Sequence, residues 1–266
     1  MFVGVRSTRT RWSGDTIADC LRALERELSY EEVEALTGVP AATVRTWDRG
    51  RVPQAGIRSL LGCGSCAACG AAPHDLAALK DTPYLYVLGV YLGDGVIYMG
   101  PRTTSLRISC DVKYPGLISE MVAAIGAIRG RDPHVGKYRR CECAVITSYW
   151  KSWPCLLPQH GAGRKHHRSI VLEPWQRELI EDDPRGLIRG LIHTDGWRGV
   201  NRVRVKGRDY AYPRYQFSNR SDDIRRIFTD ACDLLGIEWR PWGRWHVSVA
   251  RRDSVAALDE FVGLKT

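Results

Sequence analysis

Hydrophobic positions near the amino terminus follow the period of amphipathic helices. Ile17, Leu21 and Leu24 recur at helical spacing, so they are expected to share one buried helix face. Beyond residue 84 the chain alternates helix-like and strand-like stretches to its end, and the segment before that point is rich in glycine, alanine and cysteine. The pattern predicts a small all-α domain at residues 1–61, a cysteine-rich linker at residues 62–83 and a mixed α and β region after it.

Residues 29–51 carry the signals of two short helices joined by a tight turn. Ser29 and Glu32 form a capping-box pattern at the start of the first helix, and Gly38 is expected to end it. Pro40 suits the opening of the second helix. The arrangement resembles a helix-turn-helix, whose second helix would lie in the major groove of DNA, and the alternative is a helical bundle that only packs. The DNA contacts predicted for this module are Arg45, Thr46 and Arg49.

A group of cysteines stands in the linker. An odd total of 9 cysteines in a chain of 266 residues favours reduced thiols over a disulfide scaffold. Cys63, Cys66, Cys69 and His74 follow the pattern C-x2-C-x2-C-x4-H, and four sulfur or nitrogen ligands suit a structural Zn2+ site. A second, distant C-x2-C pair is missing. A loop of small residues whose thiols bind no metal is therefore the competing interpretation.

The strongest pattern is a pair of apolar segments that each end in Asp-Gly. They are VLGVYLGDG, which contains Asp94, and IRGLIHTDG, which contains Asp195. After each aspartate the chain repeats one series: strand-like residues, a helical segment, more strand-like residues and another helical segment. One structural unit is therefore expected to occur twice.

Small residues four positions apart indicate that the two segments pack together as helices. Gly89 and Gly93 fall on one face of the first segment, and Gly190 and Thr194 fall on one face of the second. An aspartate at a helix end is unfavourable by about 0.3 to 1 kcal/mol, and two such aspartates repel each other. A divalent cation bridging them would reverse both effects. Just past the helix ends, a left-handed conformation is expected at Gly95 and Gly196.

Both segments resemble the LAGLIDADG motif of DOD-type homing endonucleases, and the resemblance covers about residues 84–262. The combination with a helix-turn-helix, and with the run WPCLLPQHGAGRKHHRSIVLEPWQ at residues 153–176, is similar to a group of actinobacterial regulator-like or endonuclease-like composites. The second segment matches the motif at Gly190, Leu191, Ile192, Asp195 and Gly196.

The resemblance implies an α+β fold made of two pseudo-symmetric αββαββα halves. The halves would occupy residues 84–160 and 185–266, joined by a basic linker at residues 161–184. The two motif helices would pack at the centre, and the two sheets would form a saddle that binds DNA.

The same resemblance implies a metal-dependent DNA endonuclease. Asp94 and Asp195 would bind Mg2+ and support phosphodiester hydrolysis, one aspartate for each strand. Gln216 is the candidate for ordering water, and Lys151 and Arg252 are the candidate basic partners. Arginine does not readily give up a proton. A catalytically silent transcription regulator that binds DNA through the helix-turn-helix and the saddle is therefore the alternative, and an RNA-binding role stays open.

The charge of the chain favours nucleic acid as its partner. Lysine and arginine number 39 against 30 acidic residues, which gives a net charge of +9. In the run from Arg202 to Lys206, basic residues alternate with valines, so the basic side chains are expected on one strand face and the valines inward. The alternative is that these basic strand faces contact only solvent. The DNA contacts predicted for the halves and linker are Arg139, Lys165, Arg168, Arg202, Arg204, Lys206, Arg214 and Arg220.

The hydropathy pattern gives no sign of a membrane protein. The longest apolar stretch, from Leu85 to Leu92, is far shorter than the roughly 18 to 20 residues that a membrane-spanning helix needs. The arginine-rich start lacks the apolar core of a secretory signal. We expect a cytoplasmic, monomeric protein whose partner is double-stranded DNA and not a membrane.

Overall fold

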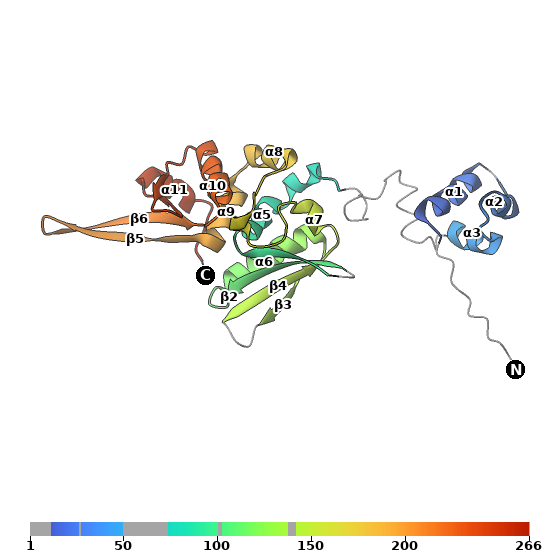
Figure 1. Cartoon of the computed structure of the whole chain (residues 1–266), viewed down its shortest axis with the longest axis horizontal. Coiled ribbons are helices and arrows are strands. Elements are labelled where there is room, and N and C mark those ends of the chain that lie inside the picture. Colours follow the sequence, from blue (N-terminus) through green and yellow to red (C-terminus); the bar gives the residue numbers. More distant parts are fainter. Residues whose placement is uncertain (1–11, 27, 50–73, 101–102, 138–141, 266) are drawn as a thin grey trace. The chain divides into compact units, whose positions relative to one another are not determined.

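The chain folds into two compact units, residues 1–74 and 75–266. The computed structural model describes residues 12–26, 28–49, 74–100, 103–137 and 142–265 (Figure 1). Within these ranges, no helix combines the length and the apolar character that crossing a membrane requires.

The described part of the smaller unit contains three helices around a buried core. The predicted capping box is present, because the Ser29 side chain accepts a hydrogen bond from the Glu32 N–H and the Glu32 carboxylate accepts one from the Ser29 N–H. Gly38 follows with φ 70°, the left-handed conformation that ends a helix. The helices are α1 (Gly14–Glu25), α2 (Tyr30–Thr37) and α3 (Ala41–Asp48), and the core residues are Ile17, Cys20, Val33, Val39, Val44 and Trp47.

The first half of the larger unit runs helix, two strands, helix, two strands, helix. Its strands form an antiparallel sheet in the order β1-β2-β4-β3, in which Gly95 pairs with Ile108. After the 3-10 helix η1 (Ala77–Asp81), the elements are α5 (Tyr84–Asp94), β1 (Gly95–Met99), β2 (Thr104–Asp111), α6 (Pro115–Arg129), β3 (His134–Lys137), β4 (Cys143–Tyr149) and α7 (Trp153–Leu156).

The second half repeats this order after a linker. Its sheet has the order β5-β6-β8-β7, and Gly196 pairs with Phe217 as Gly95 pairs with Ile108. The α+β class and the two αββαββα halves predicted from the sequence are therefore confirmed. The linker contains η2 (Lys165–His167) and α8 (Pro174–Asp182), and the half contains α9 (Arg185–Asp195), β5 (Gly196–Val205), β6 (Arg208–Ser218), α10 (Asp222–Leu234), β7 (Arg240–Trp242), β8 (His246–Val249) and α11 (Arg252–Asp259).

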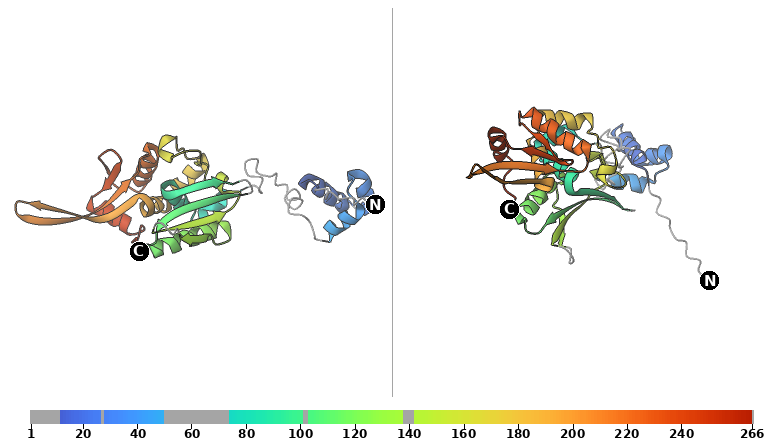
Figure 2. Two further views of the ribbon diagram at one scale, coloured as in Figure 1. Left: turned by 60° about the horizontal axis from the view of Figure 1, so that its bottom comes forward. Right: turned by 60° about the vertical axis from the view of Figure 1, so that its left-hand side comes forward.

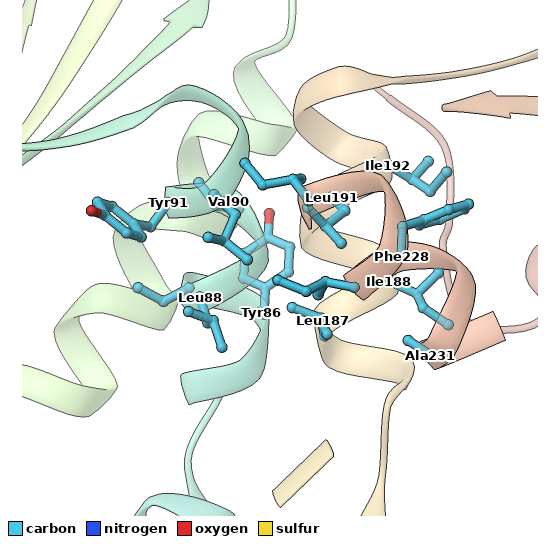
Figure 3. Packing of buried hydrophobic residues seen from close by; sticks show 14 of the residues in the cluster. Tyr86, Leu88, Val90, Tyr91, Leu187, Ile188, Leu191, Ile192, Phe228 and Ala231 are labelled. Carbon is cyan, nitrogen blue, oxygen red and sulfur yellow. The ribbon is translucent and has the colours of Figure 1, made fainter. Parts of the chain in front are cut away.

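The two motif helices, α5 and α9, pack against each other through buried hydrophobic side chains (Figure 3). Their backbones come closest at two glycines. A Cβ atom on Gly89 would overlap the Leu187 carbonyl oxygen, and one on Gly190 would overlap the carbonyl oxygen of Tyr86. The same two hypothetical atoms would lie 3.0 Å from the Cα of the opposite glycine. Because real Cβ contacts are longer, only glycine allows the two backbones to approach this closely.

The glycines after the two aspartates do not adopt the predicted left-handed conformation. Gly95 has φ −86° and Gly196 has φ −102°, which is extended backbone open to any residue. The constraint is space instead: a Cβ on Gly95 would lie 2.6 Å from the Cα of Tyr91, and one on Gly196 would lie 2.6 Å from the Cα of Ile192. Each strand therefore begins tightly against the last turn of its motif helix.

Each sheet buries one face and leaves the other open. In the first sheet Leu106, Ile108 and Ile146 are fully buried, and Arg107, which alternates with them, is partly exposed. In the second sheet, buried Phe217 is flanked by partly exposed residues on the same strand in the same way. The open faces are where a large ligand can reach the sheets.

The hairpin of β5 and β6 extends beyond the helices of the second half (Figure 2). Only residues 215–218 of β6 pair with β8, so the outer part of the hairpin has no third strand. Val200 is 45% exposed and Val203 is 40% exposed. The expectation that the valines between Arg202 and Lys206 point inward is therefore wrong for Val203, because no third strand lies beside this part of the hairpin.

Candidate functional site

Asp94 and Asp195 are the last residues of α5 and α9. Burial raises the pKa of both carboxyl groups above the ordinary aspartate value. For Asp195 the negative charge of Asp94 adds to the effect of burial, and the pKa rises to about 6. The two carboxylates therefore act on each other at the ends of the paired helices.

Lys165 and Lys265 donate hydrogen bonds to the backbone at these same helix ends. The Lys165 ammonium group donates to the carbonyl oxygens of Gly93, at 3.1 Å, and Gly95, at 2.7 Å, and also to that of Tyr91. The Lys265 ammonium group donates to the carbonyl oxygens of the equivalent residues around the end of α9, Thr194 and Gly196. Each lysine thus places positive charge at the carboxyl end of a helix, where a cation is favourable.

The two lysines and the two aspartates form one group, which we call the central charge cluster: Asp94, Asp195, Lys165 and Lys265. Burial lowers the pKa of Lys165 to about 8, although Asp195 and Asp94 both act to raise it. Burial also lowers the pKa of Lys265, and the same two carboxylates oppose that shift. All four groups are therefore partly desolvated and coupled through their charges.

Asn219 supports one aspartate only. Its side-chain amide donates a hydrogen bond of 2.6 Å to the carboxylate of Asp195, which favours the ionised form. Gly95 pairs with Ile108 in the first sheet, and Gly196 pairs with Phe217 in the second. Cys110, two residues after Ile108, is therefore the equivalent of Asn219, two residues after Phe217. The charge of Asp94 contributes to the raised pKa of the Cys110 thiol, after burial. The two halves thus surround their aspartates with different chemistry.

The predicted accessory residues differ in their relation to the cluster. Gln216 lies on the open face of the second sheet, with its side-chain amide 3.2 Å from Nδ1 of His246. Lys151, in the turn after β4, and Arg252, the first residue of α11, are exposed. Among the described residues, the cations that act on the two carboxylates are Lys165 and Lys265, and neither Lys151 nor Arg252 is one of them.

A cleft of 460 Å³ opens beside Asp195. The end of α5 forms one side of it and Asn219 and Arg220 form another, and the linker brings in a set of basic side chains. Arg220 lies over the ring of Trp245, at 4.7 Å from the ring centroid. Positive charge therefore lines the approach to the half-buried carboxylate of Asp195. The basic linker residues at the cleft are Arg164, Lys165, His166 and Arg168.

A buried hydrogen-bond network holds this part of the linker. The Gln159 side-chain amide donates to the Gln176 side-chain carbonyl, and the Gln176 amide donates to the hydroxyl of Tyr84 in α5. The Tyr84 hydroxyl in turn donates to the carbonyl oxygen of Leu156. Residues 160–175 thus form an excursion closed at its base, and Lys165 lies within it. This gives a physical role to the run at residues 153–176.

The other predicted DNA contacts lie in several settings. Arg202 and Arg204 are exposed on the outer hairpin, Lys206 occupies its turn with φ 49°, and Arg214 is half-buried. In the smaller unit, Arg45 lies over the Tyr30 ring, Thr46 donates its hydroxyl hydrogen bond to the Ala42 carbonyl, and Arg49 is exposed. Arg139 and the proposed zinc ligands Cys63, Cys66 and Cys69 lie outside the described residues.

The central charge cluster fits a hard divalent cation. Carboxylate and backbone carbonyl oxygens are the ligands that Mg2+ and Ca2+ prefer, and both occur at these helix ends. The carbonyl groups there already accept hydrogen bonds from ammonium groups, so the site accommodates positive charge. In the described part of the chain, no three side chains of His, Cys, Asp or Glu converge on one point. A cation would therefore use the carboxylates of Asp94 and Asp195 together with waters or phosphate oxygens.

The element order and the aspartates at the ends of paired helices define a two-motif α+β fold, and solved structures with similar folds exist. One is a double mutant of I-SmaMI, with 10% identity, 69% of this chain and 85% of that chain covered, and a TM-score of 0.47. Another is the LAGLIDADG meganuclease I-AabMI bound to uncleaved DNA, with 10% identity, 68% of this chain and 82% of that chain covered, and a TM-score of 0.45. A third is the I-LtrWI LAGLIDADG homing endonuclease bound to target DNA, with 7% identity, 70% of this chain and 85% of that chain covered, and a TM-score of 0.45. No family model and no curated protein matches the chain.

Proposed function

We propose that this chain is a site-specific, Mg2+-dependent DNA endonuclease of the LAGLIDADG type. The observation that carries the proposal is the central charge cluster, in which two aspartates and two lysines with shifted pKa values meet at the ends of the paired helices. A group of interacting acids and bases of this kind is typical of a catalytic site. The basic cleft beside Asp195 favours a phosphodiester as the substrate.

The residues divide the work of hydrolysis in this proposal. Asp94 and Asp195 would hold Mg2+, which supplies electrophilic stabilisation of the phosphate oxygens and activates a bound water. Lys165 and Lys265 offset the negative charge that accumulates on the phosphate. Since the pKa of Lys165 lies at about 8, its ammonium group can also exchange a proton near neutral pH. Gln216, on the open face of the second sheet, would order water in the approach to the site.

The test is incubation with a randomised duplex library and Mg2+, followed by sequencing of the cut ends. Wild type should release double-strand cuts at a defined sequence. Asp94→Asn and Asp195→Asn should each lose cleavage by about 100-fold or more while still binding DNA, because each removes one charge from the cation site. Tight binding by wild type without any Mg2+-dependent cut would reject the nuclease.

A second candidate function is a transcription regulator that binds DNA without cutting it. The smaller unit supports it, because α2 and α3 are two short helices joined at Gly38, which is compatible with the helix-turn-helix that we propose for this unit. Arg45 and Arg49 of this unit are exposed. The library test separates the two functions: a regulator gives selected duplexes in the bound fraction and no metal-dependent ends.

A further inference from the structure

The second half carries a free-standing arm formed by residues 199–214, which has no counterpart among the described residues of the first half. β5 has 10 residues and β6 has 11 residues, and β8 supports only residues 215–218 of β6. Lys206 and Gly207 close the arm with φ 49° and 78°, as in the tight turns that join two twisted strands. Beyond Tyr215, each strand of the arm therefore has only the other as its partner.

The hairpin of the first half is shorter and supported along its length. β1 has 5 residues. The β2 residues that pair with β1 also pair with β4, with the exception of Thr104 at the end of the hairpin. The difference between β5 and β1 corresponds to about 17 Å at about 3.4 Å per residue. The arm thus makes the two halves unequal in reach.

The surface of the arm combines positive charge with exposed aromatic rings. It carries Arg202, Arg204, Lys206, Arg208 and Arg214 against a single acid, Asp209. Tyr210 and Tyr212 are 38% and 48% exposed, and their rings stack in parallel with centroids 6.0 Å apart. An isolated two-stranded hairpin is marginally stable in water, and its exposed apolar groups favour a partner that covers them.

The base of the arm is fixed to the body, so the arm has a defined direction. Arg198 donates two hydrogen bonds of 2.7 Å to the Asp259 carboxylate in α11, and Tyr215 donates one of 2.6 Å to the same group. Arg198 and Tyr215 are paired across the two strands. The base of the arm is therefore held by a helix of the second half.

Duplex DNA is the partner that this chemistry fits. The major groove admits a two-stranded β-ribbon, phosphates on both sides of the groove match the excess of positive charge, and thymine methyl groups accept apolar contacts. The continuity of β5 and β6 from the Asp195 site into the arm extends the same ribbon outward from the proposed cleavage site.

We propose that the arm lies in the major groove beyond the reach of the first half, so that the target is lopsided. The half-site read by the second half extends about 4 to 5 base pairs farther from the cleavage centre than the other half-site, since about 17 Å of extra strand covers that length of duplex. The inference rests on the proposed function only in requiring duplex DNA as the ligand.

The test uses a variant that lacks residues 202–205 and 208–211. The deletion removes four residues from each strand, so the Lys206–Gly207 turn closes directly on the paired Asn201 and Tyr212. Duplexes selected by wild type with Ca2+ in place of Mg2+ are shortened one base pair at a time from each end, and Kd is measured for both proteins. Wild type should need a longer duplex on one side, and the variant should lose that requirement by about 4 base pairs while its boundary on the other side stays unchanged.

Point variants act as matched controls. Tyr210→Ser and Tyr212→Ser change exposed side chains of the arm and should each weaken binding only to duplexes that keep the long end. Tyr98→Ser, at an exposed tyrosine in β1 of the first half, should leave the long boundary in place. Equal boundaries for wild type on both sides, or an unchanged long boundary in the deletion variant, overturn the inference. Failure of wild type to select any duplex rejects the proposed function itself, and selection of structured RNA instead rejects both.

Discussion

Single residues set the distance between the two halves. Gly89 and Gly190 place the backbones of α5 and α9 in direct contact, so a methyl group at either position has no free space. At the ends of these helices, single residues also set the charge balance, because each lysine of the central charge cluster reaches the carbonyl groups of one helix.

Gly89→Ala should destabilise the larger unit by about 1 to 3 kcal/mol, since the added Cβ lies 2.9 Å from the Leu191 nitrogen and overlaps the Leu187 carbonyl oxygen. The expected fall in Tm is several degrees, at about 2 to 4 °C per kcal/mol. Gly136→Ala is the control, because a Cβ there meets nothing closer than 3.6 Å. Thermal unfolding followed by circular dichroism compares the two, and equal Tm values would contradict the packing argument.

Asn219→Ala should slow the cutting of one DNA strand more than the other. The substitution removes the 2.6 Å hydrogen bond to Asp195, and such a bond to a charged group contributes about 1.5 to 3 kcal/mol, or at least about tenfold in rate. Nicked plasmid should therefore accumulate before linear product. Cys110→Ala, at the equivalent position beside Asp94, should leave the ratio of nicked to linear DNA close to that of wild type. Identical nicking by both variants would show that Asn219 has no special role.

Among the elements, the β5–β6 hairpin depends on α11. The Asp259 carboxylate accepts hydrogen bonds from both Arg198 and Tyr215, one on each strand of the hairpin. The hydrogen bond from Arg198 is the main reason that the pKa of Asp259 lies below its ordinary value. This contact therefore joins the arm to the helix layer through an ionised group.

The Asp259 contact should make stability depend on pH in the acid range. A depressed pKa in the folded state stabilises the fold above the ordinary aspartate pKa of about 3.9, and the contribution is lost as pH falls through the lower folded-state value. Asp259→Asn should lower Tm at pH 7, and the Tm difference between the variant and wild type should shrink as pH falls below the ordinary aspartate pKa of about 3.9. Asp253→Asn in the same helix is the control. A Tm difference that stays constant between pH 7 and pH 2 would count against this account.

In the whole molecule, basic residues outnumber acidic ones, and the larger unit gathers several of them at the cleft and on the arm. A duplex that lies across both would displace counterions from its phosphates. Charge would then contribute to affinity over most of the contact.

DNA binding should accordingly weaken steeply as salt rises. If six or more phosphates are contacted, Kd should increase by about a thousandfold or more between 50 and 200 mM salt. Fluorescence anisotropy with a labelled duplex measures this slope. Reversing the charge of Arg202 and Arg204 together should reduce the slope by about two, whereas a slope near zero in wild type would exclude phosphate contacts as the source of affinity.

Local patterns predict much of this fold but only part of its candidate site. The Ser29 capping box and the Asp-Gly repeats depend on neighbours in sequence, so they could be read directly. Lys265 and Asn219 reach Asp195 only through the tertiary fold, and no local signal distinguishes them from other polar residues. The repeat itself gives a long-range signal for the two lysines: Lys165 lies 70 positions after Gly95, and Lys265 lies 69 positions after Gly196. The alternation of basic residues and valines along β5 predicts which side chains share a face of the strand, but it does not predict what covers each face.

The excursion at residues 160–175 has a consequence for how the chain can change. A connector between two copies of a unit ordinarily tolerates insertions, because its length matters little. Here the connector is closed by Gln159 and Gln176 and carries the ammonium group that rests on the end of α5. An insertion in this connector would move the Lys165 ammonium group away from the end of α5, even if both copies still folded. The length of the connector is therefore as restricted as the sequence of either copy.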